Sequence, residues 1–282
     1  METGHNLMVS EITSKQDQNN LKLSILVRLD GLSFCILDTI SGNILWYKKS
    51  GFPKEHNPVK ALEEIEAIYN QEKILHRNFT EVTLLFSNEL YSPVPSEYFI
   101  EEEASTYLKF NTKILGTDVV ESDRVNPEIV NVYIPYTNIT NYIFDRYGEF
   151  EFKHNVTELI NAALQLNAPG EITAYLNNYT GYYDLVIVKD GELLLCNTFN
   201  YETPEDFIYY LLFTAEQLEL NPAEFKLILL GNISREMAEY EIAYTYIKNI
   251  EMLEPDFKGL QQEYGTEFQR EEFLLLRSLG CE

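Results

Sequence analysis

Three short segments of this chain combine residue types that can bind phosphate or a hydrated metal ion. They are Asp30-Gly31-Leu32-Ser33, the run Asn177-Asn178-Tyr179-Thr180-Gly181, and Gly231-Asn232. A carboxylate can hold a metal-bound water, a hydroxyl can donate a hydrogen bond, and glycine lets backbone N–H groups approach an anion. The same compositions also suit plain turns, because Asp, Asn and Gly reverse the chain without any ligand. Both interpretations therefore stay open at each segment.

The common motifs of nucleotide and hydrolytic sites are absent from the sequence. It contains no Gly-x-x-x-x-Gly-Lys-Ser/Thr, no Gly-x-Ser-x-Gly and no His-Glu-x-x-His. Its four histidines and three cysteines form no spaced pair or cluster. We therefore expect neither a metal site nor a disulfide framework.

The charge balance excludes several classes of partner. The chain has 282 residues, with 21 Lys and Arg against 45 Asp and Glu, for a net charge of −24. Nucleic acids and anionic membrane surfaces are bound by clustered basic residues, so we expect no nucleic-acid partner. No apolar run approaches the roughly 20 residues of a membrane span, so we expect no membrane insertion. The polar start and the unpaired cysteines favour the cytoplasm.

Apolar periodicity predicts an α/β first half after a flexible polar leader at residues 1–20. Strands are expected first, with turns at Asp30-Gly31 and Ser41-Gly42-Asn43, and a helix, a strand and a second helix follow. The remainder is less regular. The expected strands are Leu23–Leu29, Phe34–Leu37, Ile44–Tyr47, Glu81–Phe86, Val119-Val120, Val130–Ile134 and Glu149–Lys153, and the expected helices are Val59–Leu75, Ser96–Phe110, Asn138–Tyr147 and Thr157–Leu166.

The same order of elements returns after Gly170. Asp190-Gly191 is a strong hairpin signal, and Thr203-Pro204-Glu205-Asp206 is typical of a helix start. The expected strands are Ile172–Leu176, Tyr183–Val188, Leu193–Phe199, Phe225–Leu230 and Ile250–Leu253, and the expected helices are Thr203–Leu218, Arg235–Lys248 and Phe273–Leu279, with a polar turn at Asn177–Gly181.

The two halves thus predict a duplicated architecture. Their hairpin glycines, Gly42 and Gly191, and their strand ends, Phe86 and Leu230, lie at nearly the same offset. Agreement over a whole series of elements is stronger evidence than any single element. We expect one half at residues 21–168 and a second at 169–282, the latter with a C-terminal helix.

Two β-β-β-α-β-α halves in tandem resemble the actin-like ATPase superfamily, which includes hexokinase, heat-shock chaperones and actin. That resemblance implies two ribonuclease-H-like halves around a cleft. The sequence is similar to an uncharacterised bacterial family of unknown function with this fold, over about Leu21 to Leu253. The segments that carry the likeness are Leu26–Gly31, Gly181–Val188 with Asp190-Gly191, and Leu227–Gly231. The second half also resembles cytoplasmic pilus- and secretion-assembly proteins, which act through protein contacts.

The resemblance implies Mg-ATP as the ligand of an active member, and each of its three motifs is altered here. The first phosphate loop, Asp-x-Gly-Thr/Ser, is shifted by one residue. The second, Asp-x-Gly, has Asn for Asp and Tyr179 where glycine is expected. The adenosine motif keeps one glycine of two. The residues that would form a degenerate nucleotide site are Asp30, Gly31, Ser33, Asn177, Asn178, Thr180, Gly181, Gly231 and Asn232.

Two functions follow from these observations. We favour a non-catalytic cytoplasmic module for interaction or assembly with protein partners, because all three nucleotide motifs are degraded. The alternative is an ATP-dependent enzyme, a small-molecule kinase or ATPase with atypical phosphate loops, in which Asp30 and Asp184 are the candidate catalytic carboxylates. A weaker third hypothesis is a cleft for a non-nucleotide small molecule. The chain's 20 tyrosines suit either an interaction surface or an ordinary sheet and helix packing.

Overall fold

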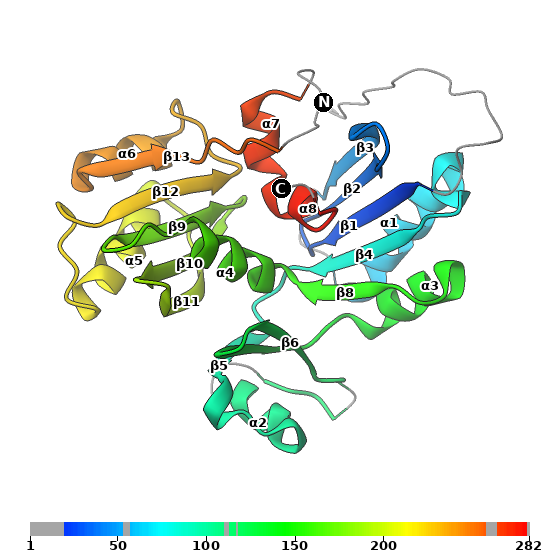
Figure 1. Ribbon diagram of the computed structural model, residues 1–282, viewed down its shortest axis with the longest axis horizontal. Helices are drawn as coiled ribbons and strands as arrows, with labels where there is room; N and C mark the ends of the chain where they lie inside the picture. Colours follow the sequence, from blue (N-terminus) through cyan, green and yellow to red (C-terminus); the bar gives the residue numbers. More distant parts are fainter. Residues whose placement is uncertain (1–19, 53–56, 110–112, 117, 258–263, 281–282) are drawn as a thin grey trace. The chain divides into compact units, whose positions relative to one another are not determined.

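The computed structural model describes residues 20–52, 57–109, 113–116, 118–257 and 264–280. Except for Asn20, the expected leader lies outside these residues. They form two compact units (Figure 1). The first unit contains the described residues up to Glu158, together with Phe257 and Leu274–Gly280. The second contains Leu159–Asp256 and Tyr264–Phe273.

A five-stranded mixed sheet forms the centre of the first unit, in the order β3-β2-β1-β4-β8. β1, β2 and β3 pair antiparallel, while β4 and β8 continue the sheet parallel to β1. The strands are β1 (Leu21–Val27), β2 (Gly31–Asp38), β3 (Asn43–Gly51), β4 (Glu81–Phe86) and β8 (Glu151–His154). All five expected strands of this sheet are confirmed, with ends shifted by a few residues.

Both faces of this sheet are covered. On one face, Tyr69 of α1 (Pro58–Gln71) packs against Phe34 with ring centroids 6.3 Å apart. Helix α3 (Thr137–Tyr147) packs beside α1. On the other face, Ser24 of β1 donates to Ser278, which follows α8 (Phe273–Arg277). Neighbouring strand residues alternate between faces, so β1 is buried along almost its whole length.

Helix α1 begins where it was predicted and ends earlier. The Asn57 side chain accepts a hydrogen bond from the Lys60 N–H at 2.9 Å and caps the helix. The α-helix ends at Gln71, and a 3₁₀ turn at Lys73–His76 replaces the last turn expected before Leu75.

A second, smaller sheet in the first unit was largely missed. It has the order β5-β7-β6, with β5 (Tyr91–Pro95), β6 (Glu121–Asn126) and β7 (Ile129–Tyr133). The predicted helix Ser96–Phe110 is wrong, because the described residues form two 3₁₀ turns, Ser96–Tyr98 and Glu101–Glu103, and only the short α2 (Ala104–Leu108). The strand expected at Val119-Val120 is also wrong, since β6 starts at Glu121. This sheet has its own apolar core, built from Val94, Leu108, Val130, Val132 and Ile134.

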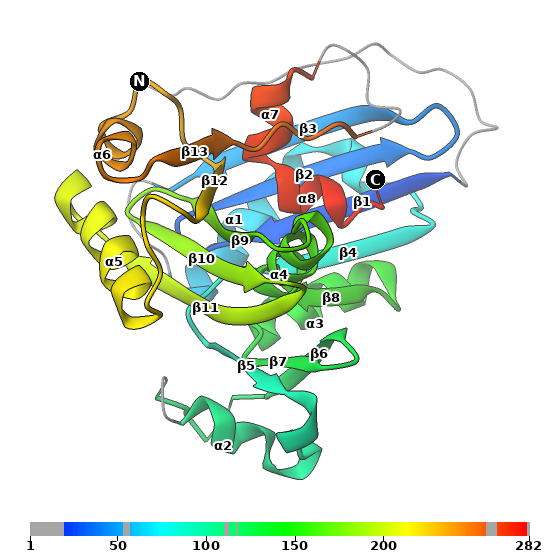
Figure 2. The same cartoon turned by 60° about the vertical axis from the view of Figure 1, so that its left-hand side comes forward.

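The second unit repeats the main sheet in the order β11-β10-β9-β12-β13. Its strands are β9 (Ile172–Asn178), β10 (Tyr182–Lys189), β11 (Glu192–Asn200), β12 (Lys226–Gly231) and β13 (Asn249–Met252). Its helices are α5 (Pro204–Gln217), α6 (Ala238–Tyr246) and α7 (Thr266–Glu271), and α4 (Asn155–Leu166) leads into it. α5 and α6, which are easiest to follow in Figure 2, share one apolar core with the sheet.

Helix α5 begins as the sequence predicted. Thr203 and Asp206 form a reciprocal capping box, each side chain accepting a backbone N–H of the other at 3.1 Å. The polar turn predicted at Asn177–Gly181 is wrong in its first part, because β9 continues through Asn178 in register with β10 and β12. The helix expected at Arg235–Lys248 shortens to α6.

The duplication extends to irregular details. The β2–β3 pairing and the β10–β11 pairing each contain one register shift, between Ile36 and Leu37 and between Ile187 and Val188. The turns after β1 and β9 also share a hydrogen bond, from the Arg28 N–H to the Gly31 carbonyl and from the Tyr179 N–H to the Tyr182 carbonyl, both 2.9 Å. Arg28 and Tyr179 therefore stand at equivalent places. Among the described helices, none is long and apolar enough to cross a membrane.

Candidate functional site

Asp30 lies in the tight turn between β1 and β2, and Gly31 is the first residue of β2. The Arg28 guanidinium donates from Nε to Asp30 Oδ1 at 2.8 Å, and Arg28 is almost fully buried. A Cβ on Gly31 would lie 2.8 Å from the Ser50 carbonyl oxygen and 3.1 Å from the Arg28 guanidinium. Glycine is thus required here by the close approach of the neighbouring strand and of Arg28. In this arrangement the Asp30 carboxylate is neutralised by a cation of its own turn.

Ser33, in contrast to Asp30, is completely buried. It lies inside β2 with no exposed surface, paired in register with Leu26 and Lys49. Its hydroxyl is buried without a hydrogen-bond partner among the described residues. The structure therefore places Asp30 and Gly31 together and Ser33 within the sheet.

The candidate residues of the second unit converge where the parallel strands β9 and β12 end. Asn177 pairs with Leu230 and Asn178 with Gly231. The Asn178 side chain donates to the Asn232 carbonyl at 2.7 Å, and the Asn232 N–H donates to the Asn178 carbonyl at 2.8 Å. The Asn178 amide oxygen accepts from the Tyr201 hydroxyl at 3.0 Å. Both hydrogen-bonding ends of the Asn178 amide are therefore used within the unit.

Gly231 closes this strand end tightly. Its φ is +80°, and a Cβ there would lie 2.3 Å from the Asn178 carbonyl oxygen and 2.5 Å from Asn177 Oδ1. The corresponding place in the first unit is Phe86, and there the Ser87 N–H donates to the Val27 carbonyl at 3.0 Å. Both units therefore have this inter-strand hydrogen bond. A glycine is needed only in the second unit, because Asn177 and Asn178 leave no room there for a side chain.

The turn after β9 carries the remaining candidates. Asn177 donates to the Tyr179 hydroxyl at 2.7 Å, and the Tyr179 ring stacks on Tyr182 with centroids 4.6 Å apart. Tyr179 is buried, Thr180 is exposed at the tip, and Gly181 has a φ of +84°. Where active members carry an Asp and a Gly, this unit holds an Asn bonded to a buried Tyr.

Asp184 is buried within β10 and does not face solvent. It is 2% exposed and accepts from the Thr198 hydroxyl at 2.6 Å. It pairs across the ladder with Asn177, so these two side chains lie on the same face of the sheet. In the duplicated register, Asp184 stands where Ser33 stands in the first unit. No pattern in the sequence identifies Thr198 and Arg28, which are the partners of the two candidate carboxylates.

A second buried polar cluster lies in the first unit, between β6 and the start of α4. Asp123 accepts hydrogen bonds from the Thr157 hydroxyl at 2.6 Å, the His154 N–H at 2.9 Å and the Tyr133 hydroxyl at 3.1 Å. Burial raises the pKa of Asp123 to about 6, and the three hydrogen bonds and Lys153 oppose that rise. No sequence motif points to this carboxylate, because its partners lie on three different elements.

His154 in the same cluster is completely buried, and burial lowers its pKa to about 3. Its Nε2 lies 3.1 Å from the Asn88 carbonyl, which can only accept, and its Nδ1 accepts from the Val156 N–H at 3.2 Å. His154 is therefore neutral with the proton on Nε2, and its ring lies against Tyr91 and Tyr133. This cluster is internal packing between the small sheet and α4.

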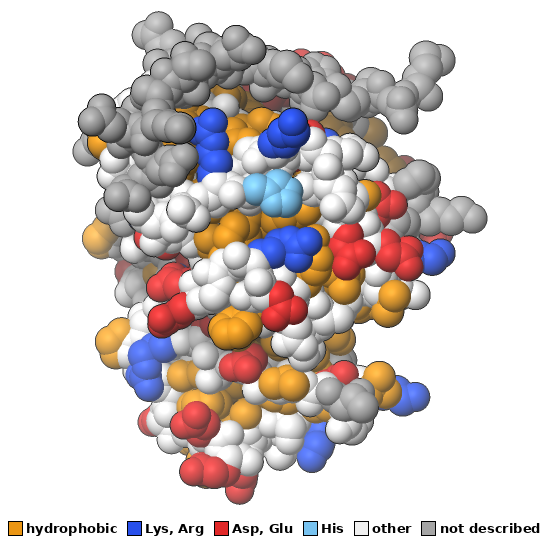
Figure 3. All heavy atoms as spheres, turned by 90° about the vertical axis from the view of Figure 1, so that its right-hand side faces the viewer, with side chains coloured by type: hydrophobic (Ala, Val, Ile, Leu, Met, Phe, Trp, Pro, Cys, Tyr) orange, Lys and Arg blue, Asp and Glu red, His pale blue; other side chains and the backbone are white. Residues whose placement is uncertain are grey.

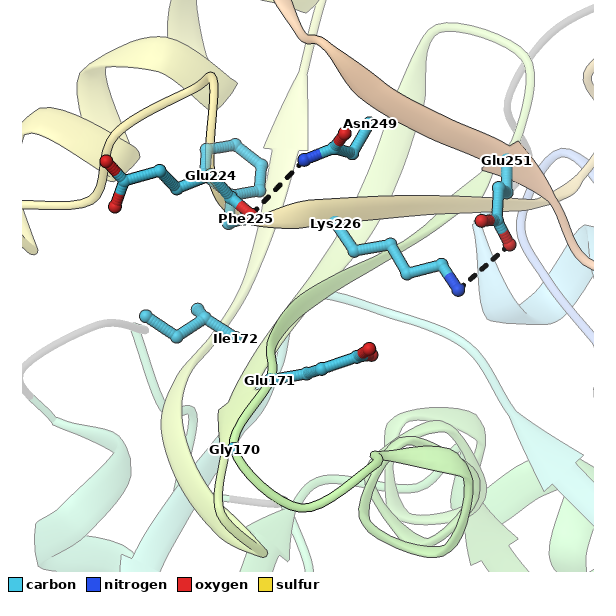
Figure 4. Close-up of a pocket in the computed structure, with 8 residues that line it drawn as sticks. All are labelled: Gly170, Glu171, Ile172, Glu224, Phe225, Lys226, Asn249 and Glu251. Carbon is cyan, nitrogen blue, oxygen red and sulfur yellow. Dashed lines mark hydrogen bonds and ion pairs between the residues drawn. The ribbon is translucent and has the colours of Figure 1, made fainter.

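The described part of the second unit also has an open hollow of about 420 Å³ at the opposite strand ends (Figure 4). Lys226 forms an ion pair with Glu251 at 2.9 Å, and Asn249 donates to the Glu224 carbonyl at 3.3 Å. Ligands of α/β sheets bind at the carboxyl ends of strands, whereas this hollow lies at the amino ends of β9 and β12. Within the described ranges no cluster of His, Cys, Asp and Glu is placed to hold a metal ion.

Two units with the same mixed sheet, the same strand order and the same bulge define the class of this protein. Comparison with solved structures agrees. A protein from Bacteroides thetaiotaomicron with actin-like ATPase fold and unknown function superposes with a TM-score of 0.80 at 21% identity, over 97% of this chain and all of that one. The PilM-PilN type IV pilus biogenesis complex matches with a TM-score of 0.58 at 14% identity, over 92% of this chain and 98% of the matched chain.

The chain thus has the actin-like ATPase fold. It belongs to the family described as "Protein of unknown function (DUF3822)", which matches residues 10–250. Among curated proteins, none matches this sequence.

Proposed function

We propose that this protein is an actin-like-fold module that works by binding a protein partner and does not hydrolyse ATP. The observation that carries the proposal is the strand end at Asn177 and Asn178. There, the side chains in the place of the second phosphate loop are hydrogen-bonded to Tyr179, Tyr201 and Asn232 of the same unit. A phosphate group would have to break these bonds in a buried setting, where unmade hydrogen bonds cost about 1–3 kcal/mol each.

The first loop supports the same conclusion. A carboxylate that holds hydrated Mg²⁺ needs its negative charge, and the Asp30 carboxylate is paired with Arg28 at 2.8 Å. The buried Ser33 hydroxyl offers no donor at the turn. These residues do not fit Mg-ATP.

The structural relatives favour a protein partner. One of the similar solved structures is the PilM-PilN type IV pilus biogenesis complex. The fold is therefore compatible with work through protein contacts. Fold alone does not establish function, so a protein partner for this chain is part of what we propose.

An ATP-dependent enzyme is the second candidate, and one observation favours it. Asn177, Asp184 and Gly231 gather at the carboxyl ends of parallel strands, the usual ligand position of α/β sheets. In this alternative Asp184 would serve as the catalytic carboxylate, and the Asn177–Tyr179 hydrogen bond would open when nucleotide binds.

A thermal melt separates the two candidates. The protein is heated with millimolar Mg-ATP, Mg-ADP or Mg²⁺ alone. A ligand at about 100 times its Kd adds about 2.7 kcal/mol, which is a shift of roughly 5–10 °C for a protein of this size. We expect no ATP-specific shift. A clear shift with ATP that disappears in Asp30→Ala or Asp184→Asn, together with phosphate release from ATP by the wild type, would refute the proposal and favour the enzyme.

A further inference from the structure

Exposed aromatic side chains gather on α5 of the second unit. Tyr209 is 59% exposed and Phe213, one turn later, is 46% exposed. Their rings stack with centroids 5.9 Å apart and planes 16° apart. Tyr209 also contacts Tyr210, which stacks on Phe199 of β11 with centroids 5.5 Å apart. We call Phe199, Tyr210, Tyr209 and Phe213 the α5 aromatic row.

The fold itself does not require the outer end of this row. The opposite side of α5 already supplies the core with its buried side chains, Phe207, Ile208, Leu211 and Ala215. Two adjacent, stacked rings left exposed on a helix form a contiguous apolar patch, and such patches mark binding surfaces more often than single exposed rings do. Tyr and Phe are enriched at the centres of protein interfaces, where their flat faces provide contact area.

The charges around the row indicate what it can bind. Glu205, Tyr209, Phe213 and Glu216 recur at three- and four-residue spacing, so they form one exposed stripe along α5. Acids therefore lie at both ends of the stacked pair, and α5 contains no Lys or Arg. By contrast, basic and acidic side chains are interspersed on the face drawn in Figure 3.

We propose that the α5 aromatic row is the docking surface for an arginine-rich segment of a partner protein. A guanidinium stacks on Tyr and Phe faces by cation–π attraction, and it pairs with carboxylates beside the ring. The chain's net charge of −24 attracts such a segment from a distance. The inference rests on the proposed interaction function and names the surface and the chemistry of the partner.

A second copy of this chain fits the surface less well. Two rows placed face to face would bring Glu205 and Glu216 against the same residues of the other copy, and both chains carry a charge of −24. Like charges across an interface oppose binding. The partner assigned here is therefore a different, basic chain.

Fluorescence anisotropy with defined peptides tests the assignment. The probes are three labelled 12-residue peptides that alternate alanine with arginine, with lysine or with glutamate. We expect the arginine peptide to bind most tightly, the lysine peptide more weakly, and the glutamate peptide not at all. Tyr209→Ser with Phe213→Ser should weaken arginine-peptide binding by about tenfold, the loss expected for two cation–π contacts.

Two further variants keep the test decisive. Phe144→Ser is the matched control, because Phe144 on α3 is 58% exposed, and it should leave the affinity unchanged. Glu205→Gln with Glu216→Gln keeps the rings and should reduce both the affinity and its salt dependence. Equal affinity for the wild type and the Tyr209/Phe213 variant would overturn the proposal, as would no binding of any peptide.

Sedimentation of the wild type and the Tyr209/Phe213 variant tests whether the α5 aromatic row instead binds a second copy of this chain. A dimer that dissociates in the variant would assign the row to a second copy and overturn the basic partner. These results are independent of the nucleotide melt, so a failure of the surface and a failure of the proposed function can be told apart.

Discussion

Replacing Asp123 by asparagine should change how the stability of the first unit depends on pH. The pKa of Asp123 rises from 3.8 to about 6 on folding. One pKa unit corresponds to about 1.4 kcal/mol, so the ionised carboxylate lowers the free energy of unfolding by about 3 kcal/mol relative to the protonated one. Because the folded pKa is the higher one, this loss is present above about pH 6 and disappears as the pH falls toward 4.

The variant should keep the local structure. An asparagine oxygen can accept from the Thr157 hydroxyl and the His154 N–H, as the carboxylate does. Its NH₂ group can donate a hydrogen bond to the Tyr133 hydroxyl. That hydroxyl can in turn donate to the Phe152 carbonyl, 3.5 Å away. The change thus removes the titrating proton and preserves the donors and acceptors around it.

His154 titrates in the opposite sense. Its folded pKa of about 3 lies below the ordinary 6.5. The stability that the neutral ring contributes is therefore fully present above pH 6.5 and is lost as the pH falls. In the wild type the two groups partly cancel between pH 6 and 4. The variant should therefore lose stability more steeply on acidification than the wild type.

The assay is urea unfolding at pH 7.5, 6.5, 5.5 and 5.0, followed by the fluorescence of the single Trp46, which lies on β3 of the same unit. The advantage of Asp123→Asn over the wild type should shrink by about 1.4 kcal/mol from pH 7.5 to 5.0. Glu128→Gln, an exposed change in the turn between β6 and β7, should show no such trend. A constant difference between the Asp123 variant and the wild type at all four pH values would refute the reasoning.

Three other variants test the second unit by chemical denaturation. Gly231→Ala should cost more than about 3 kcal/mol, because it adds a Cβ at a φ of +80° and 2.3 Å from the Asn178 carbonyl oxygen; a loss below 1 kcal/mol would show that the strand end adjusts freely. Tyr201→Phe should cost about 1–3 kcal/mol by leaving the buried Asn178 amide oxygen without its donor, and an unchanged midpoint would count against that network. Thr203→Ala should cost about 1 kcal/mol through loss of the α5 capping box, whereas Thr203→Ser should restore most of it.

Local turn and cap signals predicted much of this fold because their physics is contained in a few consecutive residues. Asp190-Gly191 forms the expected hairpin with positive φ at both residues. Thr203 through Asp206 start α5 because the cap, the proline and the first-turn acids lie within one turn. The repeat of these local signals was enough to predict the duplicated sheet.

The partners of the candidate site depend on geometry that such signals do not contain. Counting back along the hairpin from Asp190-Gly191 places Asp184 opposite Asn197, but the register shift between Ile187 and Val188 moves it opposite Thr198. Asn177 and Asn178 are typical turn residues, yet neighbouring strands on both sides extend β9 over them. In the small sheet the strand expected at Val130–Ile134 is confirmed as β7. β5 escaped prediction because it contains Pro93 and Pro95, which an edge strand tolerates.

The contribution of Leu274–Gly280 to the first unit has a consequence for how the chain is made. Ser24 and Ser278 are hydrogen-bonded across 254 positions of sequence, and Leu275 and Leu276 have no exposed surface. A ribosome releases β1 to β8 long before this segment, and it completes the strands of the second unit in between. One face of the main sheet in the first unit therefore stays uncovered until the segment Leu274–Gly280 has been synthesised. Shortened versions of the protein that stop after β13 should expose that face, and they should aggregate or recruit chaperones during translation.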